Sequence, residues 1–225
     1  AGLDSNDAGL DADAQERASA DLITLKDSVW TIANDRLRTV REVTALAGPA
    51  ASTSSLAGYL VVQQAFSSID RLEVRGRDSA GLHLFVHDHA LDLTDPATIA
   101  AIEARSGDAS FGSGSVRIVD GVLSVVHKTA AEIGELGDNS SVIRKAFAED
   151  DLLHAALAND AARTLVLGHT RWASIGIISE PNAHPLNSDL IDAEGPYVVG
   201  VLNGDVDNFA DLIAEEGVTI TPAIT

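Results

Sequence analysis

The sequence contains no cysteine, and it contains no methionine either. Without cysteine, none of the 225 residues can form a disulfide, supply a thiolate to zinc or act as a thiol nucleophile. No apolar run reaches the roughly eighteen residues of a membrane-spanning helix. The first twenty residues carry acids where a signal peptide needs a basic start and an apolar centre. We therefore expect a cytoplasmic protein that does not enter a membrane.

Basic residues are scarce as well. Fifteen Lys and Arg stand against 34 Asp and Glu, which gives a net charge of -19 and a pI near 4.4. Binding of nucleic acid needs a cationic surface, so we expect no nucleic-acid partner. Hydrophobic residues make up 45% of the chain, which is enough for a packed core. The composition predicts an acidic globular protein.

Three patterns raise the question of a metal or a nucleotide. Residues 4–15 resemble a calcium loop, but the twelfth position is glutamine instead of a bidentate glutamate. His83 and His87 share one face of a predicted strand and His89 follows it, but no cysteine or well-placed carboxylate completes a metal site. FGSGSVR (111–117) has two of the three glycines of a dinucleotide fingerprint and no predicted helix after it. We expect neither a metal nor a cofactor, and a partly exposed sheet face at the histidines.

Apolar periodicity predicts helices and strands along most of the chain. A polar leader over residues 1–19, which we expect to be mobile, precedes a long amphipathic helix over 20–47 that ends at Gly48-Pro49. Further helices are predicted over 56–72, 95–105, 129–160 and 205–216, and strands at LHLFVHD (82–88), VRIV-DG-VLSVV (116–126), TLVLGHT (164–170) and YVVGVL (197–202). The pattern predicts one mixed domain over 56–225, preceded by an acidic leader and an added helix over 1–55. Pairing through this helix would make a homodimer.

Four short blocks combine charged, aromatic and glycine residues. They are VRGRDSAG (74–81), GHTRWASIG (168–176), NAHP (182–185) and LNGD (202–205). Three of them lie at the ends of predicted strands, where residues project from the rim of a rigid sheet. We therefore expect the functional site at these blocks.

The residue types in these blocks suit recognition of an amino acid. Arg171 offers a planar fork for a carboxylate, and Trp172 beside it offers a rigid wall. Asn203 and Gly204 offer a side-chain amide and an accessible backbone N–H, the donors of an oxyanion hole. Carboxylate recognition with oxyanion stabilisation indicates amide hydrolysis.

Each block also has a purely structural interpretation. An adjacent arginine and tryptophan commonly stack, and Asn-Gly is commonly a turn. His184, which precedes Pro185, fits a buried, hydrogen-bonded histidine. The functional interpretation rests on the four blocks occurring together and in this order.

In this order the blocks resemble the glutaminase domain of class II glutamine amidotransferases. The branch they resemble is glutamine–fructose-6-phosphate aminotransferase (glucosamine-6-phosphate synthase), whose blocks read RGYDSAG, HTRWATHG, NAHP and HNG. Here they read RGRDSAG, HTRWASIG, NAHP and LNGD. The resemblance extends from about Tyr59 to the C-terminus, and residues 1–55 and 88–115 look like additions to the family plan.

This resemblance implies an α+β fold of the N-terminal-nucleophile hydrolase type, a four-layer αββα sandwich, here with an added N-terminal helical segment. In such enzymes an N-terminal cysteine attacks glutamine, and its own α-amino group serves as the base. The resemblance also implies roles for eight positions. Arg171 would hold the glutamine carboxylate, and the pocket would be lined by Trp172, Ser174 and His184. The oxyanion hole would be formed by Asn203 and Gly204, and the nucleophile would have Arg75 and Gly76 beside it.

The chain departs from the family pattern at three points. The nucleophilic cysteine is missing, and only Ala1-Gly2-Leu3 stands where the family opens with Cys-Gly-Ile. Ile175 and Leu202 replace two histidines of the family blocks. We expect the native cysteine to lie upstream of these residues, and the family's TDTE motif to follow Thr225.

The leading hypothesis is hydrolysis of L-glutamine to glutamate and ammonia. The ammonia would convert fructose 6-phosphate to glucosamine 6-phosphate in a sugar-phosphate isomerase or synthase domain beyond residue 225. The alternative is a catalytically inactive glutaminase-like module that senses a ligand or acts as a scaffold. A third hypothesis is an amidohydrolase with an N-terminal serine or threonine, for which Ser5 is the nearest candidate.

Overall fold

The computed structural model describes residues 11–49, 51–108, 111–130, 135–173, 176–188 and 196–217. The described residues divide into two compact units on either side of the Glu42–Val43 bond. This boundary differs from the expected one after residue 55. The reason is that Val43, Leu46 and Ala47 are buried in the hydrophobic core of the second unit.

The first unit is helical. It contains α1 (Ala12–Thr31), a π-helical turn η1 (Ile32–Arg36) and the first six residues of α2 (Leu37–Ala47), whose other residues belong to the second unit. The helix begins before residue 20, so residues 12–19 are helical and do not belong to a mobile leader. The side chain of Asp11 caps this start by accepting a 2.8 Å hydrogen bond from the backbone N–H of Ala14. Gly48 follows the last turn with φ at +74°, a conformation that glycine adopts without strain.

The second unit is built on a four-stranded antiparallel sheet in the order β2-β3-β1-β4. Its strands are β1 (Ser79–His87), β2 (Val116–Val119), β3 (Val122–Ala130) and β4 (Arg163–Arg171). The predicted β2–β3 hairpin is confirmed: Asp120 and Gly121 form its two-residue turn with φ of 50° and 76°. β1 lies between β3 and β4, so segments far apart in sequence become neighbours at its ends.

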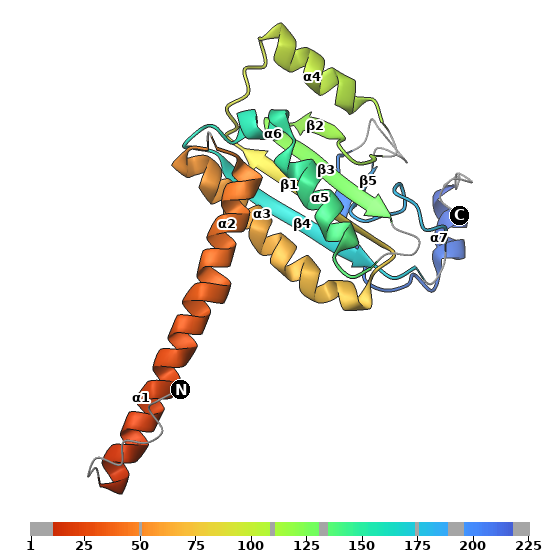
Figure 1. Ribbon diagram of the computed structural model, residues 1–225. Coiled ribbons are helices and arrows are strands. Elements are labelled where there is room, and N and C mark those ends of the chain that lie inside the picture. The colour runs from red at the N-terminus through yellow and green to blue at the C-terminus, as the bar shows by residue number, and fades with distance from the viewer. Residues whose placement is uncertain are drawn as a thin grey trace. The chain divides into compact units, whose positions relative to one another are not determined.

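Helices cover one face of this sheet (Figure 1). α3 (Thr53–Leu72) packs along β4, and α5 (Asp138–Ala148) packs along β3 and β1. Leu82, Leu84 and Val86 of β1 alternate toward this face and are fully buried. The rings of Phe66 and Phe147 meet edge to face there, with 6.0 Å between centroids. Burial of each such side chain contributes about 1.5–3 kcal/mol, so this face holds the main core.

The opposite face is more polar and carries the alternate residues of the strands. His83 is buried, stacks on Phe85 at 4.4 Å and hydrogen-bonds Ser124 through Nε2. Ser124 also lies 3.0 Å from the hydroxyl of Tyr197. His87 is exposed, and no group of three metal-ligating side chains occurs among the residues that the structure describes. His83 thus serves packing and hydrogen bonding.

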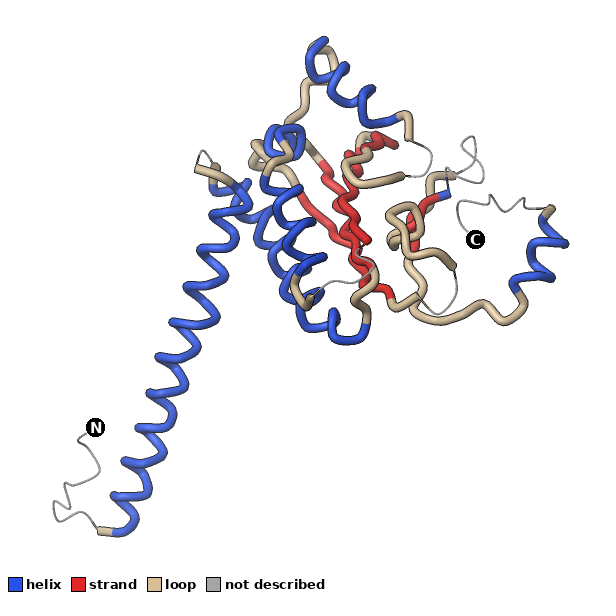
Figure 2. Tube along the Cα trace, turned by 45° about the vertical axis from the view of Figure 1, so that its right-hand side comes forward, coloured by secondary structure: helices blue, strands red, loops and turns tan. Residues whose placement is uncertain are grey.

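A two-stranded sheet lies beyond this polar face (Figure 2), made of β5 (Leu186–Asn187) and β6 (Val199–Gly200). β6 is shorter than the strand expected over 197–202. The remaining elements are η2 (Glu73–Arg75), α4 (Pro96–Ser106), α6 (Asp151–Ala156) and α7 (Phe209–Glu216). In the part of the chain described, no helix combines the length and apolar character needed to cross a membrane.

Asp150 connects three of these elements. Its carboxylate caps α6 by accepting from Leu153 N–H at 3.1 Å and receives two bonds from Arg105 of α4, at 2.8 and 2.6 Å. His127 Nε2 of β3 lies 3.0 Å from the same carboxylate. Burial by itself raises the pKa of Asp150, but the hydrogen bonds from Arg105 and His127 outweigh it and hold this pKa well below its usual range. Asp150 is therefore a charged structural residue.

Candidate functional site

The pairing of β1 with β4 joins the first two sequence blocks. Ser79 at the start of β1 pairs with Arg171 at the end of β4. One residue earlier, Asp78 N–H donates to the carbonyl of Arg171 at 3.1 Å, and its carboxylate accepts from Ala173 N–H at 2.7 Å. The antiparallel register therefore holds RGRDSAG against HTRWA through backbone and carboxylate bonds.

Gly76 permits a close approach between these same blocks. A Cβ atom at this position would lie 2.9 Å from the carbonyl carbon and the hydroxyl of Thr170, and 3.0 Å from the backbone nitrogen of Arg171. These distances are shorter than ordinary van der Waals contacts, so only glycine fits. Arg75, the residue before it, ends η2 and is exposed. The structure thus brings the predicted Arg75-Gly76 pair next to Arg171.

The third block lies over the middle of the first. The carbonyl oxygen of His184 occupies the space that a Cβ atom at Gly81 would need. Arg171 Nη1 and Asn182 Nδ2 both donate to the carbonyl of Ile177, at 3.3 and 3.0 Å. NAHP is therefore linked to the end of β4 by one shared acceptor and to β1 by direct backbone contact.

The fourth block is reached through His184 and its neighbour His169. The ring centroid of His169 lies 4.6 Å from that of His184, and His184 lines the same pocket as Leu202. Asn203 and Gly204 directly follow Leu202 and are exposed, and Gly204 has φ at +150°. All four blocks therefore converge on one side of the sheet.

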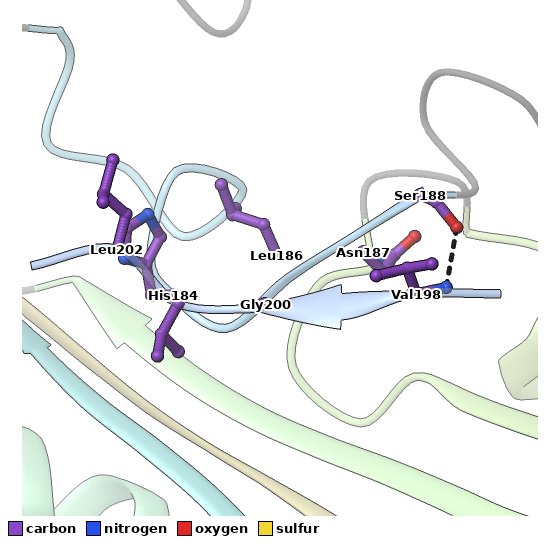
Figure 3. A pocket seen from close by; sticks show the side chains of 8 residues that line it. His184, Leu186, Asn187, Ser188, Val198, Gly200 and Leu202 are labelled. Atoms are coloured by element: carbon purple, nitrogen blue, oxygen red, sulfur yellow. Dashed lines mark hydrogen bonds between the residues drawn. The ribbon is translucent and has the colours of Figure 1, made fainter. Parts of the chain in front are cut away.

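An open pocket of about 330 Å³ lies where the third and fourth blocks meet (Figure 3). His184 and Leu202 lie together at one end of it, and Asn187, Ser188 and Val198 lie at the other. The hydroxyl of Ser188 accepts from Val198 N–H at 2.9 Å and closes this second end. The pocket is large enough for an amino acid and small compared with most drug-sized sites.

Lys128 is a site residue that the sequence interpretation missed. It pairs with Gly81 in the sheet register, as His169 does from the other side, so Lys128 and His169 flank this glycine. The Lys128 side chain is buried, and its Nζ has no hydrogen-bond partner among the described residues. A lysine at the end of the mostly apolar strand pattern VLSVVHK was the signal that could have identified it.

Two basic side chains, Arg171 and Lys128, lie among the converging blocks although the protein is acidic. Burial lowers the pKa of Lys128 to about 8, and the carboxylates of Glu180 and Asp108 oppose this shift. Burial also lowers the pKa of His184 to about 4, and the nearby charges of His169, Arg171 and Lys128 act in the same direction. Burial likewise lowers the pKa of His169. At neutral pH the site holds two neutral imidazoles beside the cations Arg171 and Lys128, which suits an anionic group.

The remaining predicted residues are less enclosed. Trp172 is 72% exposed, so its indole does not close the site in the described residues. Ser174, and with it Ile175, lies outside the residues that the structure describes, as do Ala1-Gly2-Leu3 and Ser5. His184 is the predicted pocket residue that lines the open pocket.

Comparison with known proteins gives partial similarity to one group of enzymes. The chain is 35% identical over 83 residues to glutamine–fructose-6-phosphate aminotransferase [isomerizing] of Streptococcus agalactiae, which covers 37% of this chain and 13% of the relative. It is 31% identical over 151 residues to the protein of that name from Gluconobacter oxydans, covering 67% of this chain and 16% of the relative. It is 34% identical over 122 residues to that from Mycobacterium bovis, covering 53% and 17%.

The chain thus matches less than a fifth of the length of each of these relatives. No protein-family model matches the chain. No solved structure matches it either. The sequence similarity therefore indicates a region related to these aminotransferases, which are longer than this chain.

Proposed function

We propose that the converging blocks form the glutamine site of a class II glutaminase domain with the N-terminal-nucleophile hydrolase fold. The observation that carries the proposal is the convergence itself: β1–β4 pairing, the Gly81–His184 contact and the pocket shared by His184 and Leu202 gather four blocks around Arg171 and Lys128. The product would be ammonia for the amination of a sugar phosphate, fructose 6-phosphate to glucosamine 6-phosphate. Fructose 6-phosphate, bound in a sugar-phosphate isomerase domain, would accept that ammonia.

In this function Arg171 binds the α-carboxylate of L-glutamine. Its guanidinium stands at the end of β4, and its bond to the Ile177 carbonyl sets its direction. Lys128, which pairs with Gly81 two residues along β1, adds a second positive charge in a buried place where charges act more strongly than in water. His184 and His169, being neutral, donate or accept single hydrogen bonds without repelling the ligand's ammonium group.

The chemical step needs a thiolate from a cysteine outside these 225 residues. The thiolate attacks the side-chain amide carbonyl of glutamine, and the carbonyl oxygen becomes an oxyanion held by the Asn203 amide and the Gly204 N–H. The C–N bond breaks, ammonia leaves with a proton from the cysteine's α-amino group, and water hydrolyses the remaining thioester to glutamate.

A second function has its own support. Ile175 and Leu202 stand where two histidines of the resembled family stand. A glutaminase-like module that binds glutamine without hydrolysing it, as a sensor or scaffold, keeps the carboxylate clamp and needs no cysteine. The enzyme and a glutamine sensor both require glutamine at Arg171, whereas a scaffold does not.

Titration calorimetry with L-glutamine tests the shared requirement on the 225-residue chain. Arg171→Ala is expected to weaken binding about 10- to 100-fold, because a charge-assisted pair to a carboxylate is lost. The matched control is Arg163→Ala at the other end of β4, where Arg163 forms an exposed 2.8 Å pair with Asp88. Glutaminol, which lacks the carboxylate, should bind no better to the wild-type chain than to Arg171→Ala.

Equal losses in the two variants, or no glutamine binding by the wild-type chain, would exclude the glutamine site. The full-length gene product then separates the two functions. Release of glutamate that a thiol-alkylating glutamine analogue abolishes supports the enzyme. Binding without release supports the sensor or scaffold.

A further inference from the structure

Lys128 places a buried positive charge beside the NAHP block. The residue is 2% exposed, and its Nζ has no hydrogen-bond partner among the described residues. A Cβ atom at Gly81 would lie 3.1 Å from the Cγ atom of Lys128, and closer still to the carbonyl oxygen of His184. A buried ammonium is costly unless opposite charges lie near it, so the neighbours of Lys128 decide whether it stays charged.

The strands themselves supply no opposite charge. Side chains alternate between the two faces of a strand, and paired residues of neighbouring strands share a face. Among the residues described on the four strands, no acid lies on the face that carries Lys128. The other titratable side chains of that face are Arg117, His83, His87, Arg163, His169 and Arg171.

Two carboxylates from the loops supply it instead. Glu180 lies two residues before the NAHP block, and Asp108 lies between α4 and β2. Both favour the charged form of Lys128 and so oppose the burial that lowers its pKa to about 8. The charge of Lys128 therefore depends on acids that only the loops bring to it.

Glu180 also connects the NAHP block to the loop over residues 111–114. Its Oε1 accepts a 2.6 Å hydrogen bond from the backbone N–H of Ser113, whose Oγ accepts from Lys128 N–H at 3.1 Å. The carbonyl of Glu180 accepts from Ala183 N–H at 3.0 Å, so this residue also turns the chain into the NAHP block. One residue thus contacts the loop with its side chain and the NAHP block with its backbone.

The loop over residues 111–114 is itself firmly held. Phe111 is fully buried with φ at +54°, and its ring meets that of Tyr197 edge to face at 6.1 Å. The carbonyl of Gly114 accepts from Arg105 Nε at 2.5 Å. A phenylalanine keeps a positive φ only where the surrounding contacts enforce it. The loop is therefore a fixed anchor for Glu180.

We propose that Glu180 is a positioning residue of the site: its carboxylate keeps Lys128 charged beside the NAHP block, and its bond to Ser113 ties that block to the 111–114 loop. Glu180 acts through Lys128 and His184 and not by contact with the ligand. Its effect on glutamine binding rests on the proposed function, whereas its effects on Lys128 and His184 are measurable without any ligand.

NMR of labelled lysine tests the effect on charge. Lys26, Lys128 and Lys145 are the only lysines of the chain, so their signals are few. Glu180→Gln keeps an acceptor for Ser113 N–H but removes the charge, so the titration midpoint of Lys128 should fall by about one pH unit.

The matched control is Glu149→Gln, which changes a 66% exposed acid paired with Lys145. This control should leave the midpoint of Lys128 where it is in the wild-type chain. Asp108→Asn, which removes the other nearby charge without changing Glu180, should lower the midpoint as Glu180→Gln does. An unchanged Lys128 midpoint in Glu180→Gln overturns the role in charge.

Glu180→Ala tests the positioning, because it removes the acceptor of Ser113 N–H together with the charge. Burial lowers the pKa of His184 to about 4. Loss of the anchor should expose His184, so this pKa should rise toward 6.5 in Glu180→Ala and stay near 4 in Glu180→Gln. Histidine ring NMR measures both values. Equal His184 pKa values in the two variants overturn the anchoring.

Glutamine binding separates this inference from the proposed function. For the wild-type chain, affinity should fall as Lys128 loses its proton, and in Glu180→Gln the fall should begin about one pH unit lower. Calorimetry with L-glutamine from pH 6 to pH 9 measures this. If the wild-type chain binds glutamine and both chains lose affinity at the same pH, the inference is overturned and the glutamine site stands. If the wild-type chain binds no glutamine, the glutamine site is excluded, and the two NMR titrations decide the role of Glu180 by themselves.

Discussion

The carbonyl oxygen of His184 lies directly over Gly81, in the space that a Cβ atom there would occupy. This contact sets the NAHP block on the middle of β1, and it brings the His184 imidazole beside His169. The site therefore depends on the absence of a side chain at Gly81 on the surface of the sheet.

Substitution of Gly81 should disturb both the fold and the site. Gly81→Ala is expected to lower the free energy of unfolding by about 2–3 kcal/mol, because the new methyl group meets backbone that cannot rotate away. Gly107→Ala is the control, since nothing lies within 4 Å of a Cβ there, and its effect should stay within about 1 kcal/mol. Urea denaturation measures both, and equal values contradict the contact.

His83 should make stability depend on pH in the acidic range. Burial lowers the pKa of His83 to about 3, and the charge of Lys128 adds to this. The unfolded chain takes up a proton near pH 6.5 while the folded chain does not, so stability is full above pH 6.5 and falls as the pH drops toward 3. His83→Asn should remove about 3 kcal/mol of this decrease, whereas His87→Asn, at an exposed position of the same strand, should leave it unchanged. Urea denaturation from pH 7 to pH 4 provides the comparison.

Lys128 should act in the alkaline range. Because burial lowers its pKa to about 8, the folded chain loses this proton before the unfolded chain does, and stability rises between pH 8 and the unfolded value near 10.5. Wild type should gain about 3 kcal/mol over Lys128→Met across this range. Lys145→Met, at a residue whose side chain is 74% exposed, is the matched control. Parallel pH profiles for wild type and Lys128→Met would show that Lys128 is not buried as described.

The Asp150 carboxylate should be a major source of stability. Asp150→Ala removes the α6 cap and leaves Arg105 and His127 without their acceptor, so it should cost about 3–5 kcal/mol. Asp88→Ala breaks an exposed pair with Arg163 and should cost less than about 1 kcal/mol. Because the folded pKa of Asp150 is depressed, its contribution is present above pH 4 and is lost only in stronger acid. Thermal and urea unfolding at pH 7 and pH 3 measure these differences.

Several elements follow from residues that are close together in the sequence. Asp120-Gly121 supplies the two positive φ angles of the β2–β3 turn, and Asp95 caps α4 by accepting from Thr98 N–H. Apolar spacing places α3, and alternation separates Leu82 from His83 on the two faces of β1. Such features depend on local geometry and on burial period, which the order of residues determines by itself.

Other features depended on contacts between distant segments. The pairing of β1 with both β3 and β4 placed Lys128 and His169 on either side of Gly81, and no local pattern contains that register. The burial of Val43, Leu46 and Ala47 likewise appears only when the chain is folded. The sequence by itself determined the four blocks and their chemistry. Only the tertiary structure decided that they meet and that a buried lysine lies among them, because sheet register and burial are properties of the whole packed chain.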